Sequence, residues 1–472
     1  MNTVVIAPML SERDVASGTE GGIDPLGLSA IADRLGSTLV PGVRERQLHP
    51  RFLTAIAVSL AVCDEEVFGP GAVARDGVSE PWQVFEWYLV EGLVRTSGSA
   101  REESPASDSS TPEITRDEMP TARGVPGSLK ARQAWENKVP LSAKRYLRTP
   151  TVFGFHGVYR VLARTLGIED KDTRRLGSAG FELLKVWSKE QGLPGFFVTA
   201  EGSGRAVLRD LRQAVASGLE AGQTTKGDGW SGWKFFRDHL ALYSADDTEA
   251  KSIIDCLLSN QGDANGFRHE VLKFLISTEG QKIFEDQNSE RAFHAALRSR
   301  ASEGLRQLLD AIDSYEAFAR LCQNAFDDCL VEMTRANGKV TSSHLGNLQS
   351  VKFAAEGVPA MFHELLNRLQ PFGESARLRD SCGALAEHCS ETEWARRLLQ
   401  HHRDTQQRKQ PVPKQPWAVE LDGGHWQIRS HYQRRYQPDG DAASDETRRN
   451  RYVHGYRTNS LWNFASDLKV LR

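Results

Sequence analysis

Apolar residues recur at spacings of three and four along most of this chain. The clearest run lies between Leu305 and Met333, where these spacings continue without a slip. Such a seam is typical of one face of a long helix that is buried against a neighbouring helix. The same spacing predicts a helix over 346–369 with a kink at Pro359, and shorter amphipathic helices over 83–94 and 461–471. The pattern predicts a mainly α-helical protein with a long helical bundle.

One segment follows a period of two instead. From Trp417 to Arg429, apolar residues occupy every second position on both sides of Asp422-Gly423-Gly424. Alternation around a glycine-rich turn is typical of a β-hairpin. We therefore expect one small β-hairpin near the C-terminus.

Changes in composition divide the chain. Between residues 97 and 127, Ser, Pro, Thr and acidic residues replace the apolar periodicity, and such a segment cannot bury enough surface to offset its ordering entropy. The prolines of 406–416 end the helix before them. We expect a multi-domain protein with an N-terminal helical domain (1–96), a flexible linker (97–127), a central helical domain with a basic N-terminal part (128–290), a long-helix bundle (291–405) and a basic aromatic C-terminal segment that contains the hairpin (406–472).

Composition narrows the class of protein. The chain has 472 residues, of which 39% are hydrophobic and 26% charged, so it can form several cores and is not disordered throughout. No apolar window approaches the roughly 18 residues of a membrane span, and the N-terminus lacks the features of a signal peptide. Six cysteines are too few for a disulfide scaffold. We expect a cytoplasmic protein that does not contact membranes.

The formal charge of −3 hides two basic segments. Residues 129–175 carry eleven Lys and Arg against four Asp and Glu, and residues 401–472 carry thirteen against eight. Phosphate contacts dominate non-specific affinity for nucleic acids, so both segments predict contacts with DNA or RNA. The candidate nucleic-acid-binding residues are Lys144, Arg145, Arg148, Arg160 and Arg164 in the first segment and Arg434, Arg435, Arg448, Arg449, Arg451 and Arg457 in the second.

Aromatic residues alternate with the arginines of the second segment. This mixture suits base stacking, and it also suits protein interfaces, which are enriched in Tyr, Trp and Arg. The candidate interaction residues are Tyr432, Tyr436, Tyr452, Tyr456 and Trp462. A third interpretation is that this segment docks onto the acidic body of its own chain.

Motifs for catalysis, metals and cofactors are missing from the sequence. It contains no P-loop, no dinucleotide fingerprint and no Gly-x-Ser-x-Gly motif. Two cysteine pairs with the same spacing could in principle bind zinc: Cys322 with Cys329, and Cys382 with Cys389. All four cysteines fall on apolar seam positions of helices, which favours a role in packing over zinc binding. Glu420 with Asp422 is the strand-borne carboxylate pair that a metal-dependent nuclease could use. We assign no catalytic residue and expect no metal or cofactor.

The N-terminal region resembles a known pattern. A turn from Gly21 to Gly27 opens a helix, Pro41-Gly42 ends it, and Gln47 and the pair Arg51-Phe52 begin the next helix. This arrangement, over about residues 21–53, is similar to that of an uncharacterised family of bacterial helical proteins encoded in anti-phage defence gene clusters. The chain departs from that pattern at Pro25 and at His49-Pro50. The resemblance implies a role in defence but no catalytic residue. The same residues also have a structural explanation, because Asp24 can cap the N-terminus of a helix and Pro41-Gly42 can end it.

These observations favour one hypothesis and leave two others open. The first is a non-catalytic component of a bacterial anti-phage defence system that binds nucleic acid and partner proteins, while another subunit acts as ATPase or nuclease. The second is a protein–protein scaffold or sensor that does not bind nucleic acid. The third is a divergent nuclease or hydrolase whose site is assembled from residues far apart in the sequence.

Overall fold

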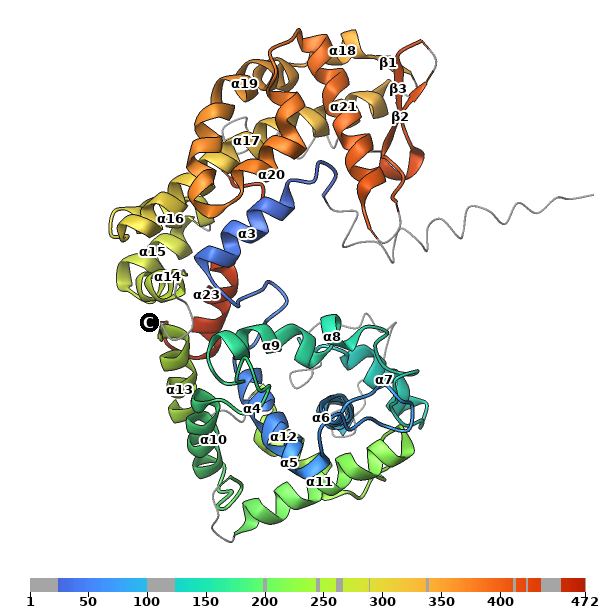
Figure 1. Cartoon of the computed structure of the whole chain (residues 1–472), viewed down its shortest axis with the longest axis vertical. Coiled ribbons are helices and arrows are strands. Elements are labelled where there is room, and N and C mark those ends of the chain that lie inside the picture. The colour runs from blue at the N-terminus through green and yellow to red at the C-terminus, as the bar shows by residue number, and fades with distance from the viewer. Residues whose placement is uncertain are drawn as a thin grey trace, which may run out of the picture. The chain divides into compact units, whose positions relative to one another are not determined.

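The computed structural model of this chain describes residues 24–99, 124–197, 202–242, 247–259, 266–287, 289–336, 339–410, 413–421, 423–433 and 451–471. Within these residues the fold is mainly α-helical and includes one small antiparallel sheet, which confirms the predicted fold class (Figure 1). Among the helices of the described residues, none has both the length and the apolar character of a membrane span. The predicted linker lies outside the described residues from 100 to 123.

The chain forms two compact units, each built from two separate stretches of sequence. Unit 1 comprises Met1–Leu39 and Lys282–Tyr456, and unit 2 comprises Val40–Gln281 and Arg457–Arg472. This division differs from the five parts expected from composition. Helices α6 (Pro81–Ser99) and α7 (Ser128–Glu136), which flank the predicted linker, pack against each other inside unit 2. A polar segment between two helices does not separate them when their apolar faces meet in space.

Unit 1 is organised around one long helix. Helix α17 (Glu303–Arg335) begins after Ser302, whose side chain accepts a hydrogen bond from the N–H of Leu305. It buries the predicted seam and packs against α19 (Gln349–Leu369), which contains Pro359. Both long helices were thus predicted correctly from their spacing. The shorter helices of this unit are α3 (Ser29–Leu39), α16 (Glu290–Arg298), α18 (Ser342–Gly346), α20 (Ser375–Cys382) and α21 (Glu391–Arg408), and α15 (Thr278–Gln287) crosses the boundary between the units.

The sheet of unit 1 has the strand order β1-β3-β2. Strands β2 (Ala418–Leu421) and β3 (His425–Ile428) form the predicted hairpin, in which Glu420 lies opposite Trp426. Strand β1 (Val340–Thr341) pairs with β3 on its other side. Two residues are too few to show an alternating pattern, which is why β1 was not predicted.

Unit 2 surrounds an almost wholly buried helix. Helix α4 (Phe52–Val62) has no charged residue and contacts α6, α9 (Phe155–Thr165), α10 (Ser178–Glu190), α11 (Ser203–Ala221) and α12 (Ser231–Leu240). Its apolar side chains therefore form the centre of this core. The remaining helices of the unit are α5 (Glu65–Phe68), α8 (Pro150–Phe153), α13 (Asp247–Leu258), α14 (Arg268–Leu275) and α23 (Thr458–Asp467).

The N-terminal pattern serves to end and anchor helices. The carboxylate of Asp24 accepts hydrogen bonds from the N–H groups of Leu28 and Ser29, so Asp24 caps the start of α3. Gln47 is buried and donates to the carbonyl oxygens of Gly42 and Val158. These contacts give both residues a structural role.

Arg51 also acts inside the core. Its guanidinium forms a buried ion pair with Glu249 of α13, with 3.1 Å between Nη2 and Oε2. Thr54 donates a hydrogen bond of 2.6 Å to the same carboxylate. Burial raises the pKa of Glu249, while Arg51 acts in the opposite direction. The arginine of the N-terminal pattern thus joins α4 to α13.

Candidate functional site

Unit 2 contains a cavity of about 840 Å³ beside α4, α6 and α9. A smaller pocket of about 310 Å³ adjoins it and shares Glu80, Trp82, His156, Arg160 and Arg174 with its lining. We call this smaller space the arginine pocket; it is lined by Glu80, Trp82, Thr151, His156, Gly157, Arg160, Val161, Arg164 and Arg174.

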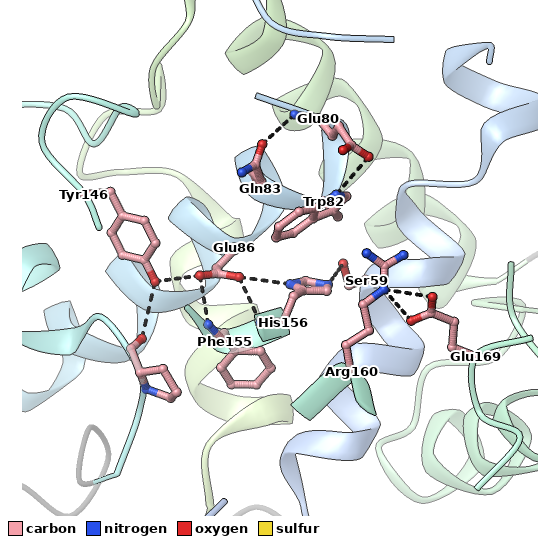
Figure 2. A network of polar contacts seen from close by, with 11 residues as sticks. Ser59, Glu80, Trp82, Gln83, Glu86, Tyr146, Phe155, His156, Arg160 and Glu169 are labelled. Atoms are coloured by element: carbon pink, nitrogen blue, oxygen red, sulfur yellow. Dashed lines mark hydrogen bonds and ion pairs between the residues drawn. The ribbon is translucent and has the colours of Figure 1, made fainter. Parts of the chain in front are cut away.

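Trp82 stands in the first turn of α6 with a fixed orientation (Figure 2). Its indole N–H donates a hydrogen bond of 3.0 Å to Oε2 of Glu80, and the backbone N–H of Glu80 donates to Oε1 of Gln83 at 2.8 Å. The ring centroid lies 4.9 Å from that of His156 and 5.8 Å from the Cζ atom of Arg160. Two residues of α9 therefore support the half-buried tryptophan.

His156 is held by a buried network that joins three helices (Figure 2). Oε2 of Glu86 accepts hydrogen bonds from the backbone N–H and from Nδ1 of His156, both at 3.0 Å. Oε1 of Glu86 accepts from the N–H of Phe155 at 2.9 Å and from the hydroxyl of Tyr146 at 2.8 Å. A carboxylate beside Nδ1 favours a proton on that nitrogen, and Nε2 forms a hydrogen bond of 2.9 Å with the hydroxyl of Ser59. Glu86 of α6 thereby caps the start of α9.

Ser59, His156 and Glu86 have the order and spacing of a Ser–His–acid relay. A nucleophile also needs access to substrate and donors for the developing oxyanion. Ser59 borders the larger cavity but has no exposed surface, and because it lies inside α4 its backbone N–H is used within the helix and cannot serve as an oxyanion donor. The network therefore positions His156 and α9, and it is not arranged for nucleophilic attack.

Arg160 offers one edge of its guanidinium to the pocket. Its Nε donates to both oxygens of the fully buried Glu169, at 2.8 and 2.7 Å. The Nε of Arg164, one turn later on α9, donates to the same carboxylate at 2.9 Å. Figure 2 shows the two terminal nitrogens of Arg160 on the edge away from Glu169, and no hydrogen bond joins them to any described residue. Glu169 thus orients Arg160 and leaves its outer donors to a ligand.

Arg174 reaches both hollows from a tightly held loop. The carboxylate of Asp170 accepts hydrogen bonds from the N–H groups of Asp172 and Thr173 and from the Thr173 hydroxyl, and the bonds from Thr173 lower the pKa of Asp170. A bridge between Glu169 and Leu176 closes the loop. Arg174 has a left-handed backbone with φ of 58°, which is rare for residues other than glycine. No described residue forms a hydrogen bond or ion pair with its exposed guanidinium.

Positive charge is concentrated in the arginine pocket. Its lining has the three guanidinium groups of Arg160, Arg164 and Arg174 and one carboxylate, that of Glu80. With the buried Glu169 included, three positive charges face two negative ones. The larger cavity adds Asp64, Glu65 and Glu66 to its lining, and Arg175 pairs there with Glu66 at 3.1 Å. The larger cavity is therefore not basic as a whole.

The first predicted basic segment lies in unit 2. Arg160 and Arg164 line the arginine pocket, as described above. Lys144, Arg145 and Arg148 are exposed and precede α8, whose Thr151 also lines the pocket. Arg145 donates to the carbonyl oxygen of Pro140 at 3.3 Å. The structure therefore brings part of this predicted set to one pocket and leaves the rest on the surface.

The second predicted segment is described only in part. Arg434, Arg435, Tyr436, Arg448 and Arg449 lie outside the described residues. Arg451 is exposed and Arg457 is 8% exposed. Trp462 is half-buried in α23.

The described aromatic residues of this segment contact their own chain. Tyr456 is buried and donates a hydrogen bond of 2.7 Å to Glu316 of α17, and the ring of Tyr452 packs against that of Tyr456. Burial raises the pKa of both phenols. The Tyr432 ring stacks on Trp417 with 5.0 Å between centroids. Tyr452 and Tyr456 thus help to dock residues 452–456 onto unit 1.

The alternative metal and nuclease residues do not form a site within the described residues. These contain no group of three or more metal-ligating side chains. Cys322 and Cys382 are buried, and burial raises the pKa of both thiols. Glu420 forms an ion pair of 3.3 Å with Arg403, and Asp422 lies outside the described residues.

Sequence reasoning missed Trp82, Glu86, His156 and Ser59. They come from α4, α6 and α9, and no spacing rule connects them. Arg174 counted toward the basic segment but was not singled out. Comparison of the chain with protein-family models, curated proteins and solved structures finds no match.

Proposed function

We propose that unit 2 binds nucleic acid through a basic face that extends from Lys144 to Arg174. The observation that carries this proposal is the convergence of Arg160, Arg164 and Arg174 on one pocket beside Trp82. Guanidinium groups pair with phosphate oxygens through parallel hydrogen bonds, and an indole ring offers a stacking surface to any base. A site for a simple carboxylate would need the cations but not the aromatic ring.

The exposed cations of the same segment extend this face. Lys144, Arg145 and Arg148 precede α8, and α8 itself reaches the arginine pocket through Thr151. A strand held at the pocket can therefore meet further positive charge along the chain. Contacts of this kind depend on the backbone of the nucleic acid and not on its sequence.

The N-terminal resemblance supports a role in bacterial anti-phage defence. We infer that the chain acts in the cytoplasm as a binding component, together with partner subunits that supply ATPase or nuclease activity. Its six free cysteines agree with a reducing compartment. Deletion of the gene, or its replacement by the binding-deficient variant below, should lower phage resistance of the bacterium to the same extent.

The binding proposal is tested by fluorescence anisotropy of the full chain with labelled single-stranded DNA, single-stranded RNA and duplex DNA at about 50 and 200 mM salt. Affinity should fall steeply with salt for at least one probe. The double variant Arg145→Glu and Arg148→Glu should bind about tenfold more weakly and with a shallower salt dependence. Lys185→Glu, an exposed change on α10 outside the basic segment, is the matched control. If none of the probes binds with salt-dependent affinity, the proposal is wrong.

A further inference from the structure

We propose that the arginine pocket receives the terminal nucleotide of a single strand, with its terminal phosphate on the arginines and its base against Trp82. This inference rests on the proposed function and specifies which part of a nucleic acid the site takes.

The shape of the site favours a strand end. The arginine pocket and the adjoining cavity have volumes of about 310 and 840 Å³, which lie in the range of sites for small molecules. A hollow of this size holds a nucleotide but not the body of a duplex. An internal nucleotide would bring its neighbours on both sides, whereas a terminal nucleotide enters with the chain leaving in one direction only.

The charge of the site also distinguishes an end from the interior. A terminal phosphate monoester carries about −1.5 to −2 charges at pH 7 and offers three acceptor oxygens, whereas each internal phosphodiester carries one charge. The outer edge of Arg160 and the guanidinium of Arg174 reach the pocket from two different elements, α9 and the 169–176 loop. The carboxylate of Glu169 forms ion pairs with Arg160 and Arg164 and so offsets part of their positive charge. The two guanidinium groups can therefore lie close together without a bound phosphate.

The indole ring of Trp82 is held in one orientation before a ligand binds. His156 supports one side of Trp82, and Glu86 and Ser59 fix both nitrogens of that histidine. The hydrogen bond to Glu80 fixes the edge of the indole. A base that stacks on Trp82 therefore meets a ring whose orientation requires little ordering on binding.

The backbone of Arg174 points to the same use. A left-handed conformation is strained for arginine and would suit glycine, yet Asp170 and the closing bridge keep the loop in this form. Strain of this kind clusters at ligand sites, where it presents a side chain in one direction. Here the presented side chain is that of Arg174, which, like Arg160, lines both hollows.

The test compares short single strands that differ only at their ends. Full-length protein is titrated with a labelled strand that carries a 5′-phosphate, a 3′-phosphate or hydroxyl groups at both ends, and with unlabelled nucleoside monophosphate as competitor. We expect one terminal phosphate to tighten binding about tenfold or more over the hydroxyl strand. The monophosphate should displace that strand.

Arg174→Gly is the decisive variant, because it removes the cation and relieves the left-handed backbone. It should fold at least as stably as the natural chain and lose the preference for a terminal phosphate. Trp82→Ala should weaken binding of the phosphorylated strand about tenfold. Lys185→Gln on α10 should leave the preference unchanged.

The outcomes separate this inference from the proposed function. Equal, salt-dependent binding of all three strands overturns the end site and leaves the proposed function standing. A preference that survives Arg174→Gly also overturns it, as does binding of the monophosphate without preference among the strands. Absence of salt-dependent binding to every strand overturns the proposed function itself.

Discussion

Replacing Glu86 by glutamine is expected to destabilise unit 2, because it converts one oxygen of a buried carboxylate into an NH₂ group. Glu86 is 0% exposed, and its two oxygens accept four hydrogen bonds. In the more favourable orientation, the amide oxygen keeps the bonds from Tyr146 and Phe155. The imidazole of His156 can then change tautomer, accept at Nδ1 and donate from Nε2 to Ser59. The backbone N–H of His156 loses its acceptor in this arrangement.

The magnitude follows from this count of partners. One buried donor left without an acceptor costs about 1–3 kcal/mol. The two bonds that remain change from charge-assisted to neutral, a loss of about 1 kcal/mol each, and removal of a buried charge returns part of this. The free energy of unfolding should therefore fall by about 2–4 kcal/mol. For a domain of this size, that lowers the midpoint of thermal unfolding by roughly 5–15 °C.

The measurement is calorimetry of the full chain at pH 7, with the transition of unit 2 followed separately. Glu182→Gln on α10 is the matched control, since Glu182 and its partner Lys185 are about 70% exposed and that pair should contribute less than about 1 kcal/mol. NMR of the His156 ring nitrogens should show the change of tautomer. If Glu86→Gln unfolds within about 0.5 kcal/mol of the natural chain, the network does not have the structural role assigned to it here.

Three further predictions concern unit 1. Burial lowers the pKa of His294 to about 3 and that of His402 to about 4, so both imidazoles bind a proton more tightly in the unfolded chain than in the folded one. The free energy of unfolding should therefore fall as the pH drops from about 6.5 toward 4. Urea unfolding at pH 7 and pH 5 measures this loss. Glu316→Ala removes the acceptor of the Tyr456 hydroxyl and should make residues 452–456 more sensitive to limited proteolysis, whereas unchanged cleavage would contradict the docking role. The Cys322 thiol is buried and its pKa is raised, so a thiol reagent should label it only after unfolding.

The sequence predicts local elements well because their signals are local. The spacing of apolar residues between Leu305 and Met333 follows directly from the period of a helix and corresponds to α17. The alternation around Asp422-Gly423-Gly424 likewise identifies the hairpin. Neither pattern requires knowledge of which surface each element meets.

The units and the pocket depend on contacts between distant segments. Glu86 and His156 are 70 positions apart, and a composition or spacing rule does not connect them. Charge counting found Arg160 and Arg164, because like charges close together in sequence are visible there. It could not show that Glu169 would hold one edge of Arg160 and leave the other edge without a hydrogen bond to any described residue, or that Tyr456 would be buried against Glu316.

The exchange of segments between the two units affects the order in which the protein can fold during synthesis. Residues 40–281 leave the ribosome long before α23, yet α23 belongs to the same unit and contacts α14. In the same way, α3 is made first but packs on α17, which is made much later. The nascent chain must therefore hold incomplete cores until translation nears residue 471. A gene cut between residues 288 and 289, which leaves α15 intact, would consequently yield two fragments that each lack a helix of their own core, because α23 is missing from the first and α3 from the second. Coexpression of the fragments, and not either one alone, should therefore restore soluble protein.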